Sequence, residues 1–354
     1  MHLLLNPGPV SLSEKVRSAM GKPDICHRET EFAELQSEIR CKLLDVYELD
    51  DSWAAITFTG SGTSALEAML TSIICNDDKV LVIENGVYGE RISKICQTYK
   101  INYTAVQHQW GEKINIDKIN EYLTSDVSYI CVVHHETTTG RLNDLEAIAK
   151  LAAKTGVPLL VDGISSFGAE ELRFSDWNIA ACAGTANKCL HGVPGMSFVI
   201  LNRSLSDRLK ANHRTLYLDL GVYLGYQDKS STPFTQSIQV MYALDAALDE
   251  HVEQGGWKAR QSQFRKKMAI VDEGMLSLGL KLLLEQSEYS CVLHSYCLPD
   301  DISYLRLHDK LKNRGYIIYE GLGDRAKSVF RISMMGAITA DDAIRFVAEV
   351  KQIV

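Results

Sequence analysis

Hydrophobic positions divide the chain into short apolar runs separated by helix-like segments. Residues 29–46 place Phe32, Leu35, Ile39, Leu43 and Val46 at spacings of three and four, which predicts an amphipathic helix. Further apolar runs occur near residues 54–58, 79–83, 129–133, 158–161, 179–183 and 197–201. Helical patterns lie between most of them, near residues 63–74, 88–99 and 143–155. This alternation predicts an α/β fold, with a mostly parallel sheet that helices cover on both faces.

The pattern changes after about residue 235. Residues 236–279 predict one or two long helices with a break at Gly255-Gly256. A strand, a helix, two strands and a helix follow, at Ser290–Ser295, Ile302–Asn313, Tyr316–Tyr319, Ser328–Ile332 and Ala340–Val354. The first ten residues predict an arm rather than an element, because Asn6-Pro7-Gly8-Pro9 prevents both a helix and a central strand. We therefore expect an N-terminal arm (1–20), a large domain (21–255) and a small C-terminal α+β domain (256–354).

Composition and charge narrow the class of protein. The 354 residues are 46% hydrophobic and 23% charged, which is typical of a globular protein, and the net charge is −8. No long Lys/Arg block indicates a nucleic-acid partner. The nine cysteines are scattered and no pair has CxxC spacing, which favours reduced thiols in a cytoplasmic protein and argues against a metal site. The N-terminal apolar run is too short for a signal peptide or a membrane span.

Three features carry candidate chemistry, and the first is a glycine-rich turn. Thr59-Gly60-Ser61-Gly62-Thr63-Ser64-Ala65 follows a predicted strand and opens a predicted helix. Free amides at a helix start, together with the hydroxyls of Ser61 and Thr63, form a cradle for a phosphate group. The same residues also fit a plain strand-to-helix turn with a Ser/Thr cap.

The second feature is an aspartate at the end of a predicted strand, in Val161-Asp162-Gly163-Ile164-Ser165-Ser166-Phe167-Gly168. A carboxylate at this position is costly unless a cation meets it. A pyridinium nitrogen is one such partner. A helix cap or a structural ion pair is the alternative interpretation of Asp162.

The third feature is a lysine among small residues, in Ala183-Gly184-Thr185-Ala186-Asn187-Lys188-Cys189-Leu190-His191-Gly192-Val193-Pro194-Gly195. Such surroundings favour an amine that reacts or is paired, although a surface lysine is the commoner case. An aldehyde cofactor held as an imine uses an amine of this kind. The phosphate cradle, Asp162 and Lys188 follow in the order that supplies the three contacts of pyridoxal phosphate (PLP): its phosphate, its ring nitrogen and its aldehyde carbon.

Several longer stretches carry a resemblance to a known family. They are Asn6-Pro7-Gly8-Pro9, Gly60-Ser61-Gly62-Thr63, Asn85-Gly86-Val87-Tyr88-Gly89, His135-Glu136-Thr137-Thr138-Thr139-Gly140, the two segments around Asp162 and Lys188, and Phe330-Arg331-Ile332-Ser333. From its first residues to its last helix, the sequence resembles the class V aminotransferase group of fold-type I PLP enzymes. Within that group it most resembles the 2-aminoethylphosphonate–pyruvate aminotransferases. The resemblance implies a seven-stranded, mostly parallel sheet, PLP as cofactor, small amine and keto-acid substrates, and a homodimer with active sites at its interface.

The resemblance also implies roles for individual residues. Lys188 is implied to be the Schiff-base lysine, and Asp162 the partner of the ring nitrogen. Arg331 is implied to bind the keto-acid carboxylate, for which a planar guanidinium is well suited; a salt bridge at the domain interface is the alternative. The other implied contacts are the phosphate with Ser61, Gly62 and Thr63, the ring face with Tyr88, the ring or its 3′-oxygen with Thr138 or Thr139, and the neighbouring subunit's phosphate with Thr235. Arg28, Arg331 and the N-terminal arm are candidates for binding the phosphonate, and His134 or His135 for a supporting role at the substrate.

Two stretches leave other activities open. The segment from Tyr226 to Gln236 and the stretch Cys26-His27-Arg28-Glu29 are closer to the broader class V group. An alanine–glyoxylate or serine–pyruvate aminotransferase is therefore the first alternative, and a cysteine desulfurase-like lyase is a more distant one. A non-enzymatic protein of the same fold and a phosphate-binding α/β domain without PLP are alternatives from other classes.

Overall fold

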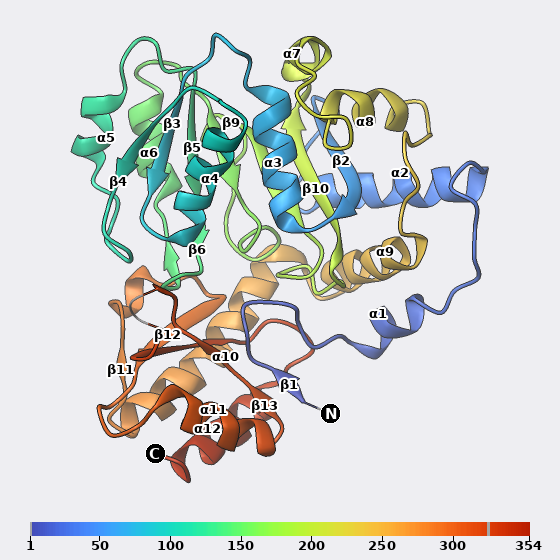
Figure 1. Ribbon diagram of the computed structural model, residues 1–354. Helices are drawn as coiled ribbons and strands as arrows, with labels where there is room; N and C mark the ends of the chain where they lie inside the picture. The colour runs from blue at the N-terminus through green and yellow to red at the C-terminus, as the bar shows by residue number, and fades with distance from the viewer. Residues whose placement is uncertain (1, 324–325) are drawn as a thin grey trace.

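The structure, a computed structural model, describes residues 2–323 and 326–354. Its largest feature is a seven-stranded sheet with the order β2-β10-β9-β8-β5-β3-β4 (Figure 1). β10 is antiparallel to both of its neighbours, and the other neighbouring pairs are parallel. The strands are β2 (Trp53–Gly60), β3 (Val80–Glu84), β4 (Tyr103–Gln107), β5 (Tyr129–Val133), β8 (Leu159–Asp162), β9 (Ile179–Thr185) and β10 (Gly195–Asn202). The predicted α/β fold and seven-stranded, mostly parallel sheet are confirmed.

Helices cover both faces of this sheet and bury two separate hydrophobic cores. One core includes side chains of α2 (Thr30–Asp45), α5 (Ile116–Tyr122), α6 (Leu145–Ala152) and α9 (Ile238–Glu253). The other includes side chains of α3 (Gly62–Ile73), α4 (Val87–Thr98), α7 (Ser206–Ala211) and α8 (Leu220–Gln227). The amphipathic helix predicted near 29–46 is α2, and its five periodic positions are all buried. Each such side chain contributes roughly 1.5–3 kcal/mol through burial.

The edge strand β4 was not predicted. Only Val106 of its five residues is buried. It therefore lacks the continuous apolar run that marks the inner strands.

The C-terminal unit, residues 256–354, follows the predicted order of elements. α10 (Gly256–Ser277) follows α9 at Gly255, whose φ of +94° is left-handed. An antiparallel sheet of order β11-β12-β15-β14 packs with α10 and α12. Its elements are β11 (Lys281–Leu282), β12 (Leu293–Cys297), α11 (Tyr304–Asn313), β13 (Tyr316–Ile317), β14 (Tyr319–Glu320), β15 (Val329–Ser333) and α12 (Ala340–Lys351). β11 was not predicted, and the division of the chain into domains stays a prediction.

The N-terminal segment differs from its prediction. Leu3–Leu4 forms β1, which runs parallel to β13 (Figure 1). The amides of Leu3 and Leu5 donate to the carbonyls of Gly315 and Ile317, both at 2.8 Å. The expectation that the first ten residues form no element is therefore wrong at these two residues, which precede the prolines and keep their amides free to pair.

The remaining short elements connect these parts. They are α1 (Glu14–Ala19), β6 (His135–Glu136), β7 (Arg141–Leu142) and the 3₁₀ turns Arg203–Leu205 and Gln286–Glu288. Within the described residues, no helix has the length and apolar character needed to span a membrane.

Candidate active site

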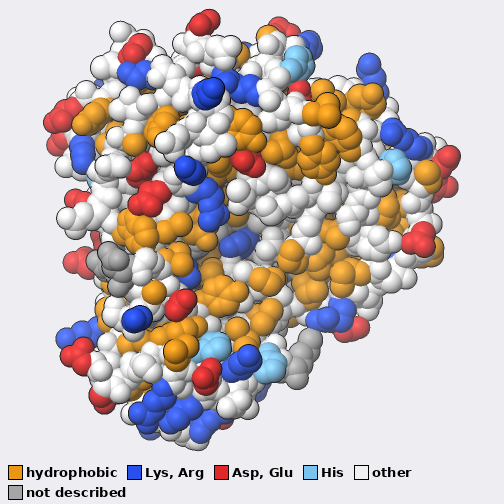
Figure 2. Space-filling view, in the orientation of Figure 1, with side chains coloured by type: hydrophobic (Ala, Val, Ile, Leu, Met, Phe, Trp, Pro, Cys, Tyr) orange, Lys and Arg blue, Asp and Glu red, His pale blue; other side chains and the backbone are white. Residues whose placement is uncertain are grey.

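The candidate site lies where several parallel strands end. β8 ends at Asp162 and β9 at Thr185, and the loop after β9 carries Lys188. Tyr88 lies in the first turn of α4, which follows β3, and Thr138 lies in the turn between β6 and β7, which follow β5 at the same edge of the sheet. This edge is where ligands bind in open α/β sheets. Figure 2 shows Lys and Arg side chains at a hollow in the middle of one face of the molecule.

Lys188 is held against the N-terminal segment. Its Nζ donates a hydrogen bond to the carbonyl of Pro7. Gly8 has a left-handed φ of +110°, and a Cβ there would lie 2.8 Å from Cδ of Lys188. Burial lowers the pKa of Lys188 to about 8, with Arg331 and Arg91 lowering it further and the Asp162 carboxylate opposing them. The side chain therefore carries a larger share of free amine at neutral pH than an exposed lysine does.

Asp162 is a buried carboxylate, 3% exposed. Its Oδ1 accepts a hydrogen bond from the amide of Ile164 at 3.0 Å. Burial raises its pKa to about 6, although Arg91 and Lys188 act in the opposite direction. No ion pair of Asp162 occurs among residues 2–323 and 326–354, so the structural ion pair considered above is not observed.

The glycine-rich turn opens α3 as predicted. Ser61 is the residue before the helix, and helix geometry leaves the amides of Gly62 and Thr63 without intrahelical acceptors. A Cβ at Gly62 would lie 2.9 Å from Cγ2 of Ile164, so a larger residue would disturb the loop after Asp162. The turn and Asp162 are therefore next to each other in space, 100 residues apart in sequence.

Thr138 connects the loop after β5 to the start of α4. Its hydroxyl accepts from the amide of Val87 at 2.9 Å and donates to Glu136 at 2.5 Å. Glu136 also accepts from the amide of Gly89 at 3.2 Å. The Thr139 hydroxyl, in contrast, is buried with no partner among the described residues. Nothing in the sequence marks Glu136 apart from the stretch His135–Gly140, whereas in the structure it lies against the start of α4. Burial raises its pKa to about 7.

Arg331 projects from β15 and links the C-terminal unit to the site. Its Nη1 donates to the carbonyl of Thr137 and its Nε to the carbonyl of Glu320, both at 2.8 Å. It is 3% exposed, and burial lowers its pKa. No carboxylate in the described part of the chain forms an ion pair with it, so the alternative of a salt bridge at the interface is not supported.

Arg28 and Thr235 lie at the surface of this chain. Nη1 of Arg28 donates to the carbonyl of Thr232 at 2.9 Å, so Arg28 contacts the loop that carries Thr235 rather than Lys188. Both side chains are exposed. The loop that carries Thr235 lies beside the glycine-rich turn, because the side-chain oxygen of Gln236 accepts a hydrogen bond from the amide of Thr59 at 2.8 Å. In the described part of the chain, no hydrogen bond joins Arg28 or Thr235 to Lys188 or Asp162.

The two adjacent histidines are buried beside the Asp162 loop. Nδ1 of His134 hydrogen-bonds the Ser166 hydroxyl, and Nδ1 of His135 the carbonyl of Ser165, both at 3.0 Å. Burial lowers the pKa of each to about 3. Both rings are therefore neutral at physiological pH, and each holds the loop through its Nδ1. Nε2 of His135 is buried without a partner among the described residues.

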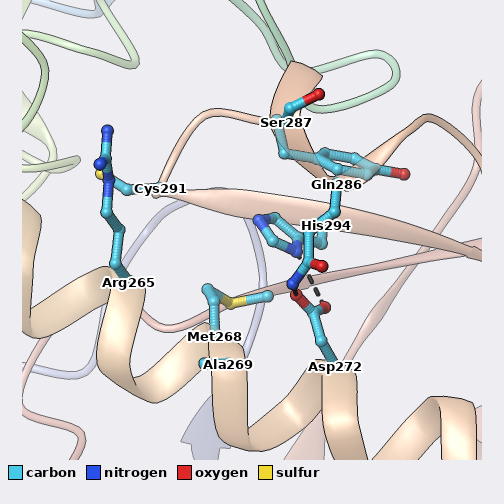
Figure 3. Close-up of a pocket in the computed structure, with 9 residues that line it drawn as sticks. Arg265, Met268, Ala269, Asp272, Gln286, Ser287, Cys291 and His294 are labelled. Carbon is cyan, nitrogen blue, oxygen red and sulfur yellow. Dashed lines mark hydrogen bonds and ion pairs between the residues drawn. The ribbon is translucent and has the colours of Figure 1, made fainter.

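A separate cavity of about 300 Å³ lies in the C-terminal unit (Figure 3). Its buried Asp272 accepts hydrogen bonds from His294 at 2.9 Å and from Tyr296 at 2.6 Å. None of the predicted site residues lines this cavity. Because Asp272, His294 and Tyr296 hydrogen-bond one another, we assign them to the packing between α10 and β12.

The pKa of Lys188 leads to a test of its environment. In the protein without cofactor, we expect the rate at which Lys188 reacts with a small aldehyde to reach half of its maximum near pH 8, because only the free amine reacts. Asp162→Asn removes a carboxylate that stabilises the ammonium, so the midpoint should move below that of the wild type. Borohydride trapping and peptide mass spectrometry from pH 6 to 11 would measure this, with exposed Lys150 as the internal comparison. A midpoint near the ordinary value of 10.5 would contradict the burial.

Comparisons with known proteins agree with this geometry. A sequence family described as aminotransferase class V matches residues 12–343. The chain is 33% identical to a 2-aminoethylphosphonate–pyruvate transaminase of Phocaeicola vulgatus, covering 99% of each chain. It is 34% identical to a protein of the same name from Vibrio cholerae, over 98% of this chain and 96% of that one. Among solved structures, the alanine–glyoxylate aminotransferase of a Nostoc species superposes with a TM-score of 0.92 at 25% identity, over 99% of this chain and 95% of the other.

Proposed function

The chain belongs to the class V aminotransferase family, and from that membership we propose that it transfers the amino group of 2-aminoethylphosphonate to pyruvate. The likeness over nearly the full length to transaminases that carry this substrate pair in their names is the observation that supports it. The products are phosphonoacetaldehyde and L-alanine, and the same exchange can run in reverse. The chain is a PLP-dependent aminotransferase.

The side chains around Lys188 fit PLP. Asp162 is a buried carboxylate that lacks a cation, and the protonated ring nitrogen supplies one. Ser61, Gly62 and Thr63 present amides and hydroxyls for the phosphate. Lys188 supplies the amine that would bond to the aldehyde carbon of PLP. We assign the ring face to Tyr88. The Thr138 hydroxyl is already engaged, whereas the hydroxyls of Thr137 and Thr139 are buried without a partner among the described residues, so these two are the candidate donors to the ring's 3′-oxygen.

The chemistry follows from these positions. PLP, when bound, supplies an electron-poor ring that accepts electron density from the carbon bearing the amino group. Lys188 is the base that takes the proton from that carbon; with a pKa of about 8, roughly a tenth of its amine is unprotonated at pH 7. Asp162 holds the proton on the ring nitrogen. Arg331 has no carboxylate partner in the described chain and binds the carboxylate of pyruvate.

A homodimer is part of the proposal. Arg28 and Thr235 are exposed on one surface of the chain, where Arg28 hydrogen-bonds the loop that carries Thr235. In a dimer that surface would face the site of the second chain, where Thr235 would reach the cofactor phosphate and Arg28 the substrate. The cytoplasmic location that the scattered cysteines predict also belongs to this proposal.

A half-reaction experiment tests the amino donor. The PLP form of the enzyme is mixed, without keto acid, with 2-aminoethylphosphonate, L-alanine or L-serine, and the visible absorbance of the bound cofactor is followed. We expect 2-aminoethylphosphonate and L-alanine to discharge the absorbance. Taurine, with a sulfonate in place of the phosphonate, is the matched control and should react far more slowly. Discharge by L-serine but not by 2-aminoethylphosphonate would overturn the proposal in favour of a serine–pyruvate activity.

A further inference from the structure

Arg91 lies inside the candidate site, although no sequence pattern singled it out. It is on α4, one turn after Tyr88, and its guanidinium carbon is 4.6 Å from the centroid of the Tyr88 ring. Its Nη1 is 3.4 Å from the hydroxyl oxygen of Thr63, in the first turn of α3. The side chain therefore spans the space between the ring assigned to the cofactor face and the turn assigned to its phosphate.

The charge of Arg91 is not balanced by the protein. Other arginines of the large sheet region are paired, such as Arg40 and Arg203 with Asp228. Arg91 forms no ion pair with any residue that the structure describes. Its field reaches the reactive groups, because it lowers the pKa of both Asp162 and Lys188. A partly buried cation of this kind is stabilised by an anion that arrives from outside the chain.

The position next to Thr63 indicates which anion that is. The amides of Gly62 and Thr63 and the start of α3 favour a phosphoryl group, but the turn itself contains no cation. A guanidinium offers paired donors that match phosphoryl oxygens. The contact with Tyr88 holds its plane in place, as cation–π contacts do.

We propose that Arg91 is the cation of the phosphate cradle and binds the phosphoryl dianion of PLP. The phosphonate of the amino donor has the same chemistry, but the contact with Thr63 favours the cofactor. The inference rests on the cofactor and not on the identity of the amino donor, so a different amino donor would leave it standing.

The test compares a ligand that has the phosphate with one that lacks it. Dissociation constants of PLP and of pyridoxal are measured on cofactor-free wild type, Arg91→Gln and Arg91→Lys by absorbance or fluorescence titration. We expect Arg91→Gln to weaken PLP by roughly 10- to 100-fold and to leave pyridoxal within about twofold. Arg91→Lys keeps the charge but loses the paired geometry and should be intermediate. Lys94→Gln, on an exposed position of the same helix, is the matched control and should change neither.

Three outcomes would overturn the inference. Equal weakening of PLP and pyridoxal would assign Arg91 a structural role at Tyr88. Unchanged PLP affinity with a raised KM for 2-aminoethylphosphonate at saturating cofactor would assign the cation to the amino donor. Unchanged behaviour in both measurements would leave Arg91 outside the site. If Arg91→Gln does not fold, Arg91→Lys carries the same comparison, and a PLP affinity equal to that of the wild type would count against the proposal.

Discussion

Replacement of Lys188 by alanine is expected to lower kcat for transamination by about 1,000-fold or more. The substitution removes both the amine that holds the cofactor aldehyde and the base that moves the proton, and general acid–base catalysis alone contributes roughly 10²- to 10⁴-fold. Steady-state alanine formation measures the loss. Borohydride reduction followed by peptide mapping should label Lys188 in the wild type and leave the variant unlabelled.

Two controls separate this chemical loss from a loss of structure. Lys150→Ala removes an exposed lysine on α6 and should leave kcat unchanged. A small amine such as methylamine should restore part of the activity of the Lys188→Ala protein, because it can enter the space that the lysine side chain leaves and take the proton there. Residual activity within tenfold of the wild type, or a borohydride label on another lysine, would contradict the assignment.

The sequence predicted the core of the site because its residues follow the order of the strands. Parallel strands end at one edge of the sheet, so a cradle after β2, Asp162 after β8 and Lys188 after β9 must meet there. The long buried strands and helices were predicted because their sequences carry clear signals. Each such strand is a continuous apolar run, and each such helix has apolar residues at spacings of three and four.

What the sequence did not predict depends on contacts between distant segments. In the sequence, Arg91 is an ordinary charged residue on the polar side of a predicted helix. Only the folded structure shows that it lies next to Thr63. Glu136 gains its role from the amide of Gly89, 47 positions earlier. The pairing of β1 with β13 joins residues more than 300 positions apart, and two leucines give no periodic pattern.

The N-terminal segment shows how such a contact serves the site. Leu5 is buried in the core of the C-terminal unit, while the carbonyl of Pro7 accepts a hydrogen bond from Lys188. The amide of Ser333 donates to the carbonyl of Leu5 at 2.9 Å, two residues after Arg331. One short segment therefore joins the strand of the carboxylate-binding arginine to the lysine.

Replacement of Arg331 by glutamine is expected to lower kcat/KM for pyruvate by about 100-fold. Truncating one member of a buried hydrogen-bonded charge pair costs about 2–5 kcal/mol. A 100-fold loss in kcat/KM corresponds to about 2.8 kcal/mol, in the lower half of that range. The hydrogen bonds of Arg331 go to the main-chain carbonyls of Thr137 and Glu320. Glutamine therefore removes the positive charge and the paired N–H donors of the guanidinium, and it leaves no carboxylate unpaired in the described chain. PLP affinity should stay close to that of the wild type, because the proposed cofactor contacts do not include Arg331.

An acceptor without a carboxylate shows whether the loss is specific. With propanal in place of pyruvate, Arg331→Gln should differ little from the wild type, because no carboxylate is there to be bound. Arg141→Gln is the matched control: it removes another buried arginine near the same junction, one that pairs with Glu288 at 2.8 Å. Any structural loss in that variant should affect both acceptors alike and leave their ratio unchanged. If Arg331→Gln also lowers pyruvate and propanal turnover by the same factor, the arginine supports the junction between the two parts of the chain and the carboxylate is bound elsewhere.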